Sequence, residues 1–153
     1  MLVESLATAL RDPTNKVRTR RNAAQSLGKL GKAAISATGA LAVAATDENC
    51  DVRRRSIEAL GLVGAAATDA ACQCASASAA SAAGSSPVMF VIGILCEALL
   101  RDSDAVVREA AALALMRVDM AMQTLGGAAR SPESAMALSS ALSKDQSAVV
   151  RKI

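Results

Sequence analysis

The sequence of 153 residues has no histidine, tryptophan or tyrosine, and Phe90 is its only aromatic residue. Without histidine, the chain cannot build a Ser-His-Asp or Cys-His catalytic relay, a Glu-x-x-His di-metal site or a His-ligated zinc site. Without further aromatic side chains, it has no stacking platform for single-stranded nucleic acid. These absences argue against several common enzyme classes, and we expect no bound cofactor and no metal.

Cysteines are few and irregularly spaced, at Cys50, Cys72, Cys74 and Cys96. They form no paired Cys-x-x-Cys units, so they match neither a disulfide framework nor a zinc site. We therefore expect free thiols and an intracellular, reducing compartment: the cytoplasm, or an organelle interior if a targeting segment has been removed. The longest apolar run, Val88 to Cys96, is about half of the roughly 20 residues that span a bilayer, so we expect no transmembrane helix.

Small apolar residues dominate what is present. The composition is 52% hydrophobic, and alanine alone makes up roughly a quarter of the chain. Alanine favours helix and disfavours strand, so the composition predicts an all-α fold, and the length suits a single domain. The net charge of +3 is unevenly distributed: residues 1–64 carry ten Lys and Arg against six Asp and Glu, and residues 65–153 carry seven against eight.

Four segments repeat one pattern around an aspartate, at Asp12, Asp47, Asp102 and Asp145. Each aspartate is followed two residues later by Thr, Asn, Asp or Ser, five later by Val and six later by Arg. The residues two positions later are helix N-cap types, and apolar residues at helical spacing follow them. Another short helical pattern precedes each aspartate, so we predict antiparallel helical hairpins with the aspartate in each turn.

The repeat divides the chain into five segments: repeat 1 (1–32), repeat 2 (33–64), an Ala/Ser-rich insert (65–87), repeat 3 (88–127) and a partial repeat 4 (132–153). We expect Gly28 with Gly31, and Gly61 with Gly64, to end the second helices of repeats 1 and 2. Repeat 1 has two extra residues after its valine, which predicts a bulge or a shifted helix start. The insert is expected to be a loosely held helix or a mobile segment. We expect the short final helix of repeat 4 to dock against another segment or to continue in a longer protein.

This pattern resembles the HEAT repeat, particularly the short type described as PBS-lyase HEAT-like. Asp47 through Gly64 is the best match to the motif Asp-x-x-x-x-Val-Arg followed by Ala-Leu-Gly-x-Val-Gly, and Asp102 through Val118 is close to it. The resemblance implies an α-solenoid of about three and a half hairpins, whose second helices line the concave face. It also implies a hydrogen-bonded ladder between repeats, made by each turn aspartate and the arginine six residues later. The ladder residues are Asp12 and Arg18, Asp47 and Arg53, Asp102 and Arg108, and Asp145 and Arg151.

Basic residues in the first two repeats form the main candidate site. Between Pro13 and Thr46 there are six Lys and Arg and no acidic residue. This cluster suits an acidic protein partner or a phosphate group, although a merely solvated face is the alternative. Nucleic acid is disfavoured because the net charge is small and aromatics are almost absent. Phe90 is added because its apolar helix is either a core helix covered by the insert or a contact with another protein or a membrane-embedded subunit. The predicted partner-binding residues are Lys16, Arg20, Arg21, Arg54, Arg55 and Phe90.

Catalysis is not expected, because no pair of carboxylates has a spacing that suggests acid–base chemistry. We predict a non-catalytic protein-interaction scaffold or an assembly subunit of a larger complex. Two alternatives remain open: an accessory subunit of a bilin-lyase-type enzyme, which only the resemblance suggests, and the binding of phosphate or nucleic acid through the basic cluster.

Overall fold

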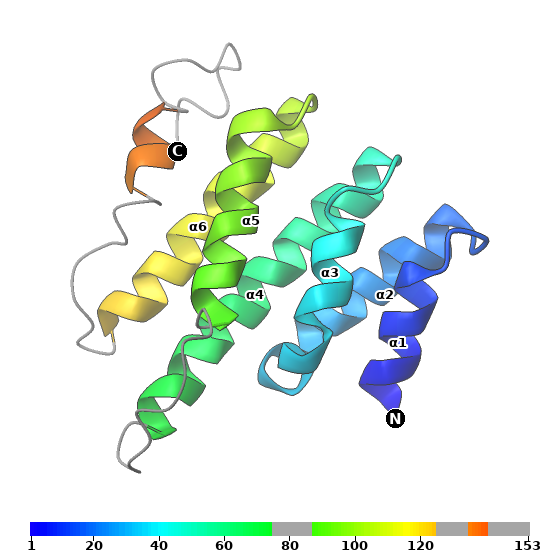
Figure 1. Cartoon of the computed structure of the whole chain (residues 1–153), viewed down its shortest axis with the longest axis horizontal. Helices are drawn as coiled ribbons and strands as arrows, with labels where there is room; N and C mark the ends of the chain where they lie inside the picture. Colours follow the sequence, from blue (N-terminus) through cyan, green and yellow to red (C-terminus); the bar gives the residue numbers. More distant parts are fainter. Residues whose placement is uncertain (75–86, 125–134, 141–153) are drawn as a thin grey trace.

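The computed structural model describes residues 1–74, 87–124 and 135–140, and every regular element within these ranges is helical (Figure 1). The elements are α1 (Leu2–Arg11), α2 (Val17–Leu30), the 3₁₀ helix η1 (Gly31–Ala37), α3 (Thr38–Ala44), α4 (Cys50–Cys74), α5 (Pro87–Arg101) and α6 (Ala105–Thr124). Residues 135–140 form one further short helical segment. The predicted all-α fold class is confirmed.

Three antiparallel hairpins stack side by side: α1 with α2, α3 with α4, and α5 with α6 (Figure 1). Helices α1, α3 and α5 form one layer, and α2, α4 and α6 form the other. The core is the thin apolar zone between these layers, where Leu27, Leu60 and Leu115 occupy equivalent places and are fully buried. Because no large central core has to be filled, alanine, valine and leucine are sufficient, which explains how the fold forms almost without aromatics.

The aspartate of each described turn fixes the backbone that leads into the second helix. Oδ1 of Asp47 accepts a hydrogen bond from the backbone N–H of Asn49 at 2.9 Å, and Oδ1 of Asp102 accepts one from Asp104 at 2.9 Å. Asn49 then caps α4, since its Oδ1 accepts from the backbone N–H of Asp51 at 3.0 Å. This side-chain bonding explains why an aspartate recurs at the turn.

The turn of repeat 1 is two residues longer than the others. Asp12 accepts hydrogen bonds from the backbone N–H of Thr14 at 2.9 Å and from its hydroxyl at 2.6 Å, and these bonds lower the pKa of Asp12. Thr14 therefore does not cap a helix, and α2 begins only at Val17. The shifted helix start that the sequence predicts is confirmed, whereas the expectation that Thr14 is the N-cap is wrong.

Of the two helix ends that glycines predict, one is confirmed and the other is wrong. Gly31 follows the last residue of α2 with a φ of 51°, so the predicted end of this helix is confirmed. Helix α4, however, continues through Gly61 and Gly64 to Cys74, so these glycines do not end it. Residues 65–74 of the predicted insert thus prolong α4, and residues 75–86 lie outside the described part. The predicted end of repeat 3 at residue 127 and most of partial repeat 4 also lie outside it.

The interior glycines of α4 have a packing role instead. A Cβ atom at Gly61 would lie 2.6 Å from Cβ of Ala114 on α6, and one at Gly64 would lie 3.0 Å from Val91 on α5. Real Cβ atoms essentially never lie as close as 2.6 Å to another carbon, and 3.0 Å would require the neighbour to shift. Helix α4 therefore approaches its neighbours this closely because these positions lack a side chain. None of the described helices combines the length and the hydropathy that crossing a membrane would require.

Candidate interaction surface

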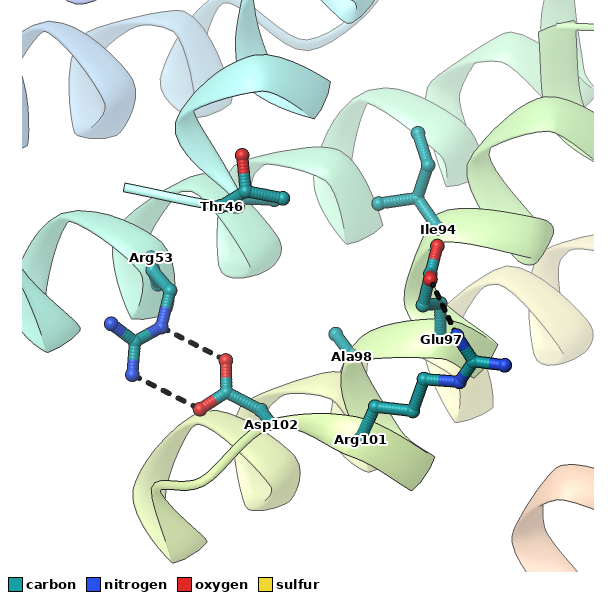
Figure 2. Close-up of a pocket in the computed structure, with 8 residues that line it drawn as sticks. Thr46, Arg53, Ile94, Glu97, Ala98, Arg101 and Asp102 are labelled. Carbon is teal, nitrogen blue, oxygen red and sulfur yellow. Dashed lines mark hydrogen bonds and ion pairs between the residues drawn. The ribbon is translucent and has the colours of Figure 1, made fainter. Parts of the chain in front are cut away.

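Arg53 connects the turn of repeat 2 to the turn of repeat 3. Its Nε donates to Oδ2 of Asp102 at 2.9 Å and its Nη2 to Oδ1 at 3.1 Å, a bidentate pair visible in Figure 2. Nη2 also donates to Asp104, and Nη1 donates to the backbone carbonyls of Asp47 and Glu48 at 3.0 and 3.1 Å. The side chains of Arg53 and Asp102 are only 13% and 8% exposed. The hydrogen bonds to Asp102 raise the pKa of Arg53, so its guanidinium stays charged.

Arg20 has the same role between repeats 1 and 2. Its Nε and Nη2 donate to the two carboxylate oxygens of Asp47 at 2.8 and 3.0 Å, and its Nη1 donates to the carbonyls of Pro13 and Asn15. The hydrogen bonds to Asp47 raise the pKa of Arg20. The sequence predicts Arg20 as a partner-binding residue, but its guanidinium already forms hydrogen bonds within the fold.

The ladder assignment in repeat 1 is therefore corrected from Arg18 to Arg20. Arg18 lies exposed on α2 and has no ion pair with a described residue. The physical reason is the longer turn, which moves the start of α2 by two residues relative to Asp12. Arg20 and Arg53 occupy equivalent positions relative to the buried leucine of their helices. Arg20 precedes Leu27 by as many residues as Arg53 precedes Leu60.

The remaining ladder residues are described only in part. Nη1 of Arg108 donates to the carbonyls of Asp102 and Ser103 at 2.9 and 3.1 Å, the same bonds that Arg53 makes to its own turn. Asp145 and Arg151 lie outside the described residues. The structure thus brings together two inter-repeat pairs, Arg20–Asp47 and Arg53–Asp102.

Alanine substitutions on α2 test the corrected ladder. We expect Arg20→Ala to lower the free energy of unfolding by about 2 kcal/mol, because it leaves the largely buried Asp47 carboxylate without its cation. Arg18→Ala, two residues away on the same helix, is expected to change it by less than about 0.5 kcal/mol. Urea unfolding followed by circular dichroism measures both values. A larger loss for Arg18→Ala would restore the assignment made from the sequence.

The predicted basic cluster separates into two parts in the structure. On α4, Arg55 pairs with Glu58 at 2.7 Å, and Arg54 lies 3.8 Å from Glu58 and 3.9 Å from Asp51. These two arginines are locally balanced by two carboxylates. Around α2, in contrast, four cations have no ion pair with any residue that the structure describes: Lys16, Arg18, Arg21 and Lys29. The unbalanced positive charge therefore lies on α2.

Helix α5 has two different sides despite its apolar sequence. Val91, Ile92 and Leu95 are buried against the neighbouring helices, whereas Phe90 and Met89 are substantially exposed. The predicted contact residue Phe90 therefore points outward in the first-helix layer, on the side of the solenoid opposite the α2 cations.

Helix α6 carries an exposed apolar row that the sequence analysis did not single out. Val106, Leu113 and Met120 are all exposed, and their seven-residue spacing places them along one line of the helix. The buried residues of α6 follow a separate stripe that includes Val107, Ala111 and Leu115. A second apolar repeat at seven-residue intervals was the signal that could have revealed the exposed row.

Two shallow pockets adjoin the ladder at equivalent places. One of about 220 Å³ is lined by Thr46 and Arg53 and by the end of α5 (Figure 2). The other, of about 290 Å³, lies beside Arg20 and Asp47. Both are at or below the small end of ligand-binding sites, about 300 Å³. The ladder residues in their lining are already paired, Arg53 with Asp102 and Arg20 with Asp47. In the described ranges, no group of His, Cys, Asp or Glu is arranged to hold a metal ion, and neither Cys50 nor Cys96 forms a disulfide with a described residue.

Stacked hairpins joined by arginine–aspartate pairs at their turns define an α-solenoid. Residues 91–118, which run from α5 through the turn into α6, match the family model of the HEAT repeat. This third hairpin is thus a HEAT repeat, although the sequence motif had matched repeat 2 best. A comparison with curated proteins finds no match.

Among solved structures, the chain is similar to the crystal structure of an engineered protein. The two share 18% sequence identity with a TM-score of 0.63, and the match covers 98% of this chain. This chain spans 58% of the length of the engineered protein. The likeness extends over almost all of the chain and supports the same helical solenoid architecture.

Proposed function

We propose that the chain is a non-catalytic interaction scaffold, or an assembly subunit, that binds a protein partner with an acidic surface. HEAT repeats generally mediate protein–protein interaction, and solenoids of this kind are typically not enzymes. The observation that carries the more specific proposal is a group of cations on α2 that have no ion pair with any described residue, which includes Arg18, Arg21 and Lys29. A positive row without local carboxylates attracts an acidic partner and raises its association rate.

The proposed contact residues differ from those predicted from sequence alone. Arg20 is removed because it holds Asp47, and Arg54 and Arg55 are secondary because carboxylates on α4 balance them. Lys16 and Arg21 remain, and Phe90 is a proposed second contact in the other layer. The bilin-lyase and phosphate alternatives gain no support from the described residues.

A charge-reversal experiment tests this function. The affinity-tagged full chain is used to isolate partners, and the affinity of the purified complex is measured by calorimetry at low and high salt. We expect Arg18→Glu with Arg21→Glu to weaken the complex at least about tenfold, and we expect added salt to weaken the wild-type complex.

The matched control reverses two charges in the opposite layer, Arg11→Glu with Arg101→Glu, and both residues are exposed. Its net charge equals that of the α2 variant, and we expect it to change affinity less than about twofold. The proposal fails if the two variants weaken the complex equally, or if the chain forms no stoichiometric complex.

A further inference from the structure

The exposed side of the second helices changes its chemistry from one repeat to the next. We define the second-helix face by the exposed or half-buried positions nine and two residues before, and two and five residues after, the buried leucine of each second helix. For the first repeat these are Arg18, Gln25 and Lys29 on α2, followed by Lys32 in η1. On α4 they are Asp51, Glu58, Leu62 and Ala65, and on α6 they are Val106, Leu113, Arg117 and Met120.

Each helix thus contributes a row with its own character. The α2 row is cationic and polar, and it contains no carboxylate. The α4 row has two carboxylates, but Arg54 and Arg55 beside them make it nearly neutral. The α6 row is mainly apolar, with Arg117 as its one cation. Positive charge is therefore greatest over the first repeat, and apolar exposure is greatest over the third.

The distance between the α2 and α6 rows determines how long a bound segment must be to contact both. Packed helices lie about 8–10 Å apart, so the α2 and α6 rows are about 16–20 Å apart. The close approach of Gly28 to Ala59, and of Gly61 to Ala114, places these helices in direct contact. An extended chain advances about 3.3 Å per residue and so crosses this distance in about five or six residues.

We propose that the second-helix face binds one extended segment of a partner protein, with acidic side chains over α2 and aliphatic side chains about six residues away over α6. This inference rests on the proposed function and adds the form and orientation of the partner segment. Charge complementarity selects acidic groups at α2, and the exposed Val106, Leu113 and Met120 select aliphatic groups at α6. A nucleic acid fits less well, because its phosphates would meet an apolar row at one end.

Defined peptides test the arrangement with the full chain. The main probe is a fluorescein-labelled peptide with three glutamates, three glycine or serine residues and three leucines, which places the block centres about six residues apart. Two comparison peptides replace either the glutamates or the leucines by serine. By fluorescence anisotropy, we expect the two-block peptide to bind at least about tenfold more tightly than either comparison peptide.

Variants of the chain assign each block to its row. We expect Arg18→Glu with Lys29→Glu, and separately Leu113→Asp, to weaken binding of the two-block peptide about tenfold each. For the leucine the control is Leu100→Asp on α5, because Leu100 is 50% exposed and Leu113 47% exposed, in opposite layers. For the charge the control is Arg11→Glu with Arg101→Glu in the opposite layer, which has the same net charge as the α2 variant. Both controls are expected to stay within about twofold of wild type, and circular dichroism verifies that each variant is folded.

Several results would overturn the inference. They are equal binding of the two-block and single-block peptides, equal effects of Leu113→Asp and Leu100→Asp, and no binding of any peptide at millimolar concentration.

Self-association of the chain that Leu113→Asp abolishes would show that a second copy occupies the second-helix face. Oligonucleotide binding that is lost on reversal at α2 and unaffected by Leu113→Asp would make the α2 row a nucleic-acid surface. If the peptides fail while the salt-sensitive protein complex persists, only this arrangement is wrong and the proposed function stands.

Discussion

Arg53→Ala is expected to lower the free energy of unfolding by about 2–4 kcal/mol. The substitution removes the bidentate pair with Asp102 and the bonds to Asp104 and to two carbonyls of its own turn. It also leaves a largely buried carboxylate without its cation. Because these bonds join repeat 2 to repeat 3, the loss should appear as a lower midpoint in urea unfolding.

Arg101→Ala is the matched control for this prediction. Arg101 also forms an ion pair, with Glu97 at 3.4 Å, but its side chain is 79% exposed. Exposed ion pairs of this kind contribute little to stability, so we expect Arg101→Ala to change the free energy of unfolding by less than about 0.5 kcal/mol. Arg53→Lys should lower the free energy of unfolding by an amount between those of Arg53→Ala and Arg101→Ala. Lysine keeps the positive charge but lacks the planar guanidinium that makes the bidentate pair. Equal losses for Arg53→Ala and Arg101→Ala would show that the ladder does not stabilise the stack.

Gly61→Val is expected to destabilise the chain by about 2–3 kcal/mol. A Cβ at this position already lies 2.6 Å from Cβ and 2.9 Å from Cα of Ala114, so α4 and α6 must move apart. Gly61→Ala is expected to cost about 1 kcal/mol, because the gain in helix propensity offsets part of the clash. Thermal and urea unfolding measure both effects.

Gly93→Ala separates packing from helix propensity. Gly93 is also inside a helix, but a Cβ there meets no atom within 4 Å. Alanine at this position should stabilise the protein by up to about 1 kcal/mol, opposite in sign to its effect at Gly61. Ala114→Gly should recover part of the loss caused by Gly61→Ala. If Gly61→Ala stabilises the protein as Gly93→Ala does, the close approach of α4 and α6 is wrong.

The fold was predictable because its determinants are local and repeated. Alanine content, the spacing of apolar residues and a side-chain-bonded turn at Asp47 and Asp102 each act over a few residues, so they can be read along the chain. The candidate site was less predictable. Arg18 and Arg20 are nearly indistinguishable in sequence, and only the position of Asp47 in the neighbouring repeat determines which one forms the ladder.

By itself, the sequence determined that this chain is all-helical, that its hairpins repeat, and that its excess positive charge lies in the first half. Only the tertiary structure decided which arginines are engaged, that Gly61 packs and does not end a helix, and that an apolar row on α6 stays exposed. The physical reason is distance. Helix formation and turns depend on neighbours within about four residues, whereas ion pairing and close packing depend on residues of the next repeat, such as Asp102 for Arg53.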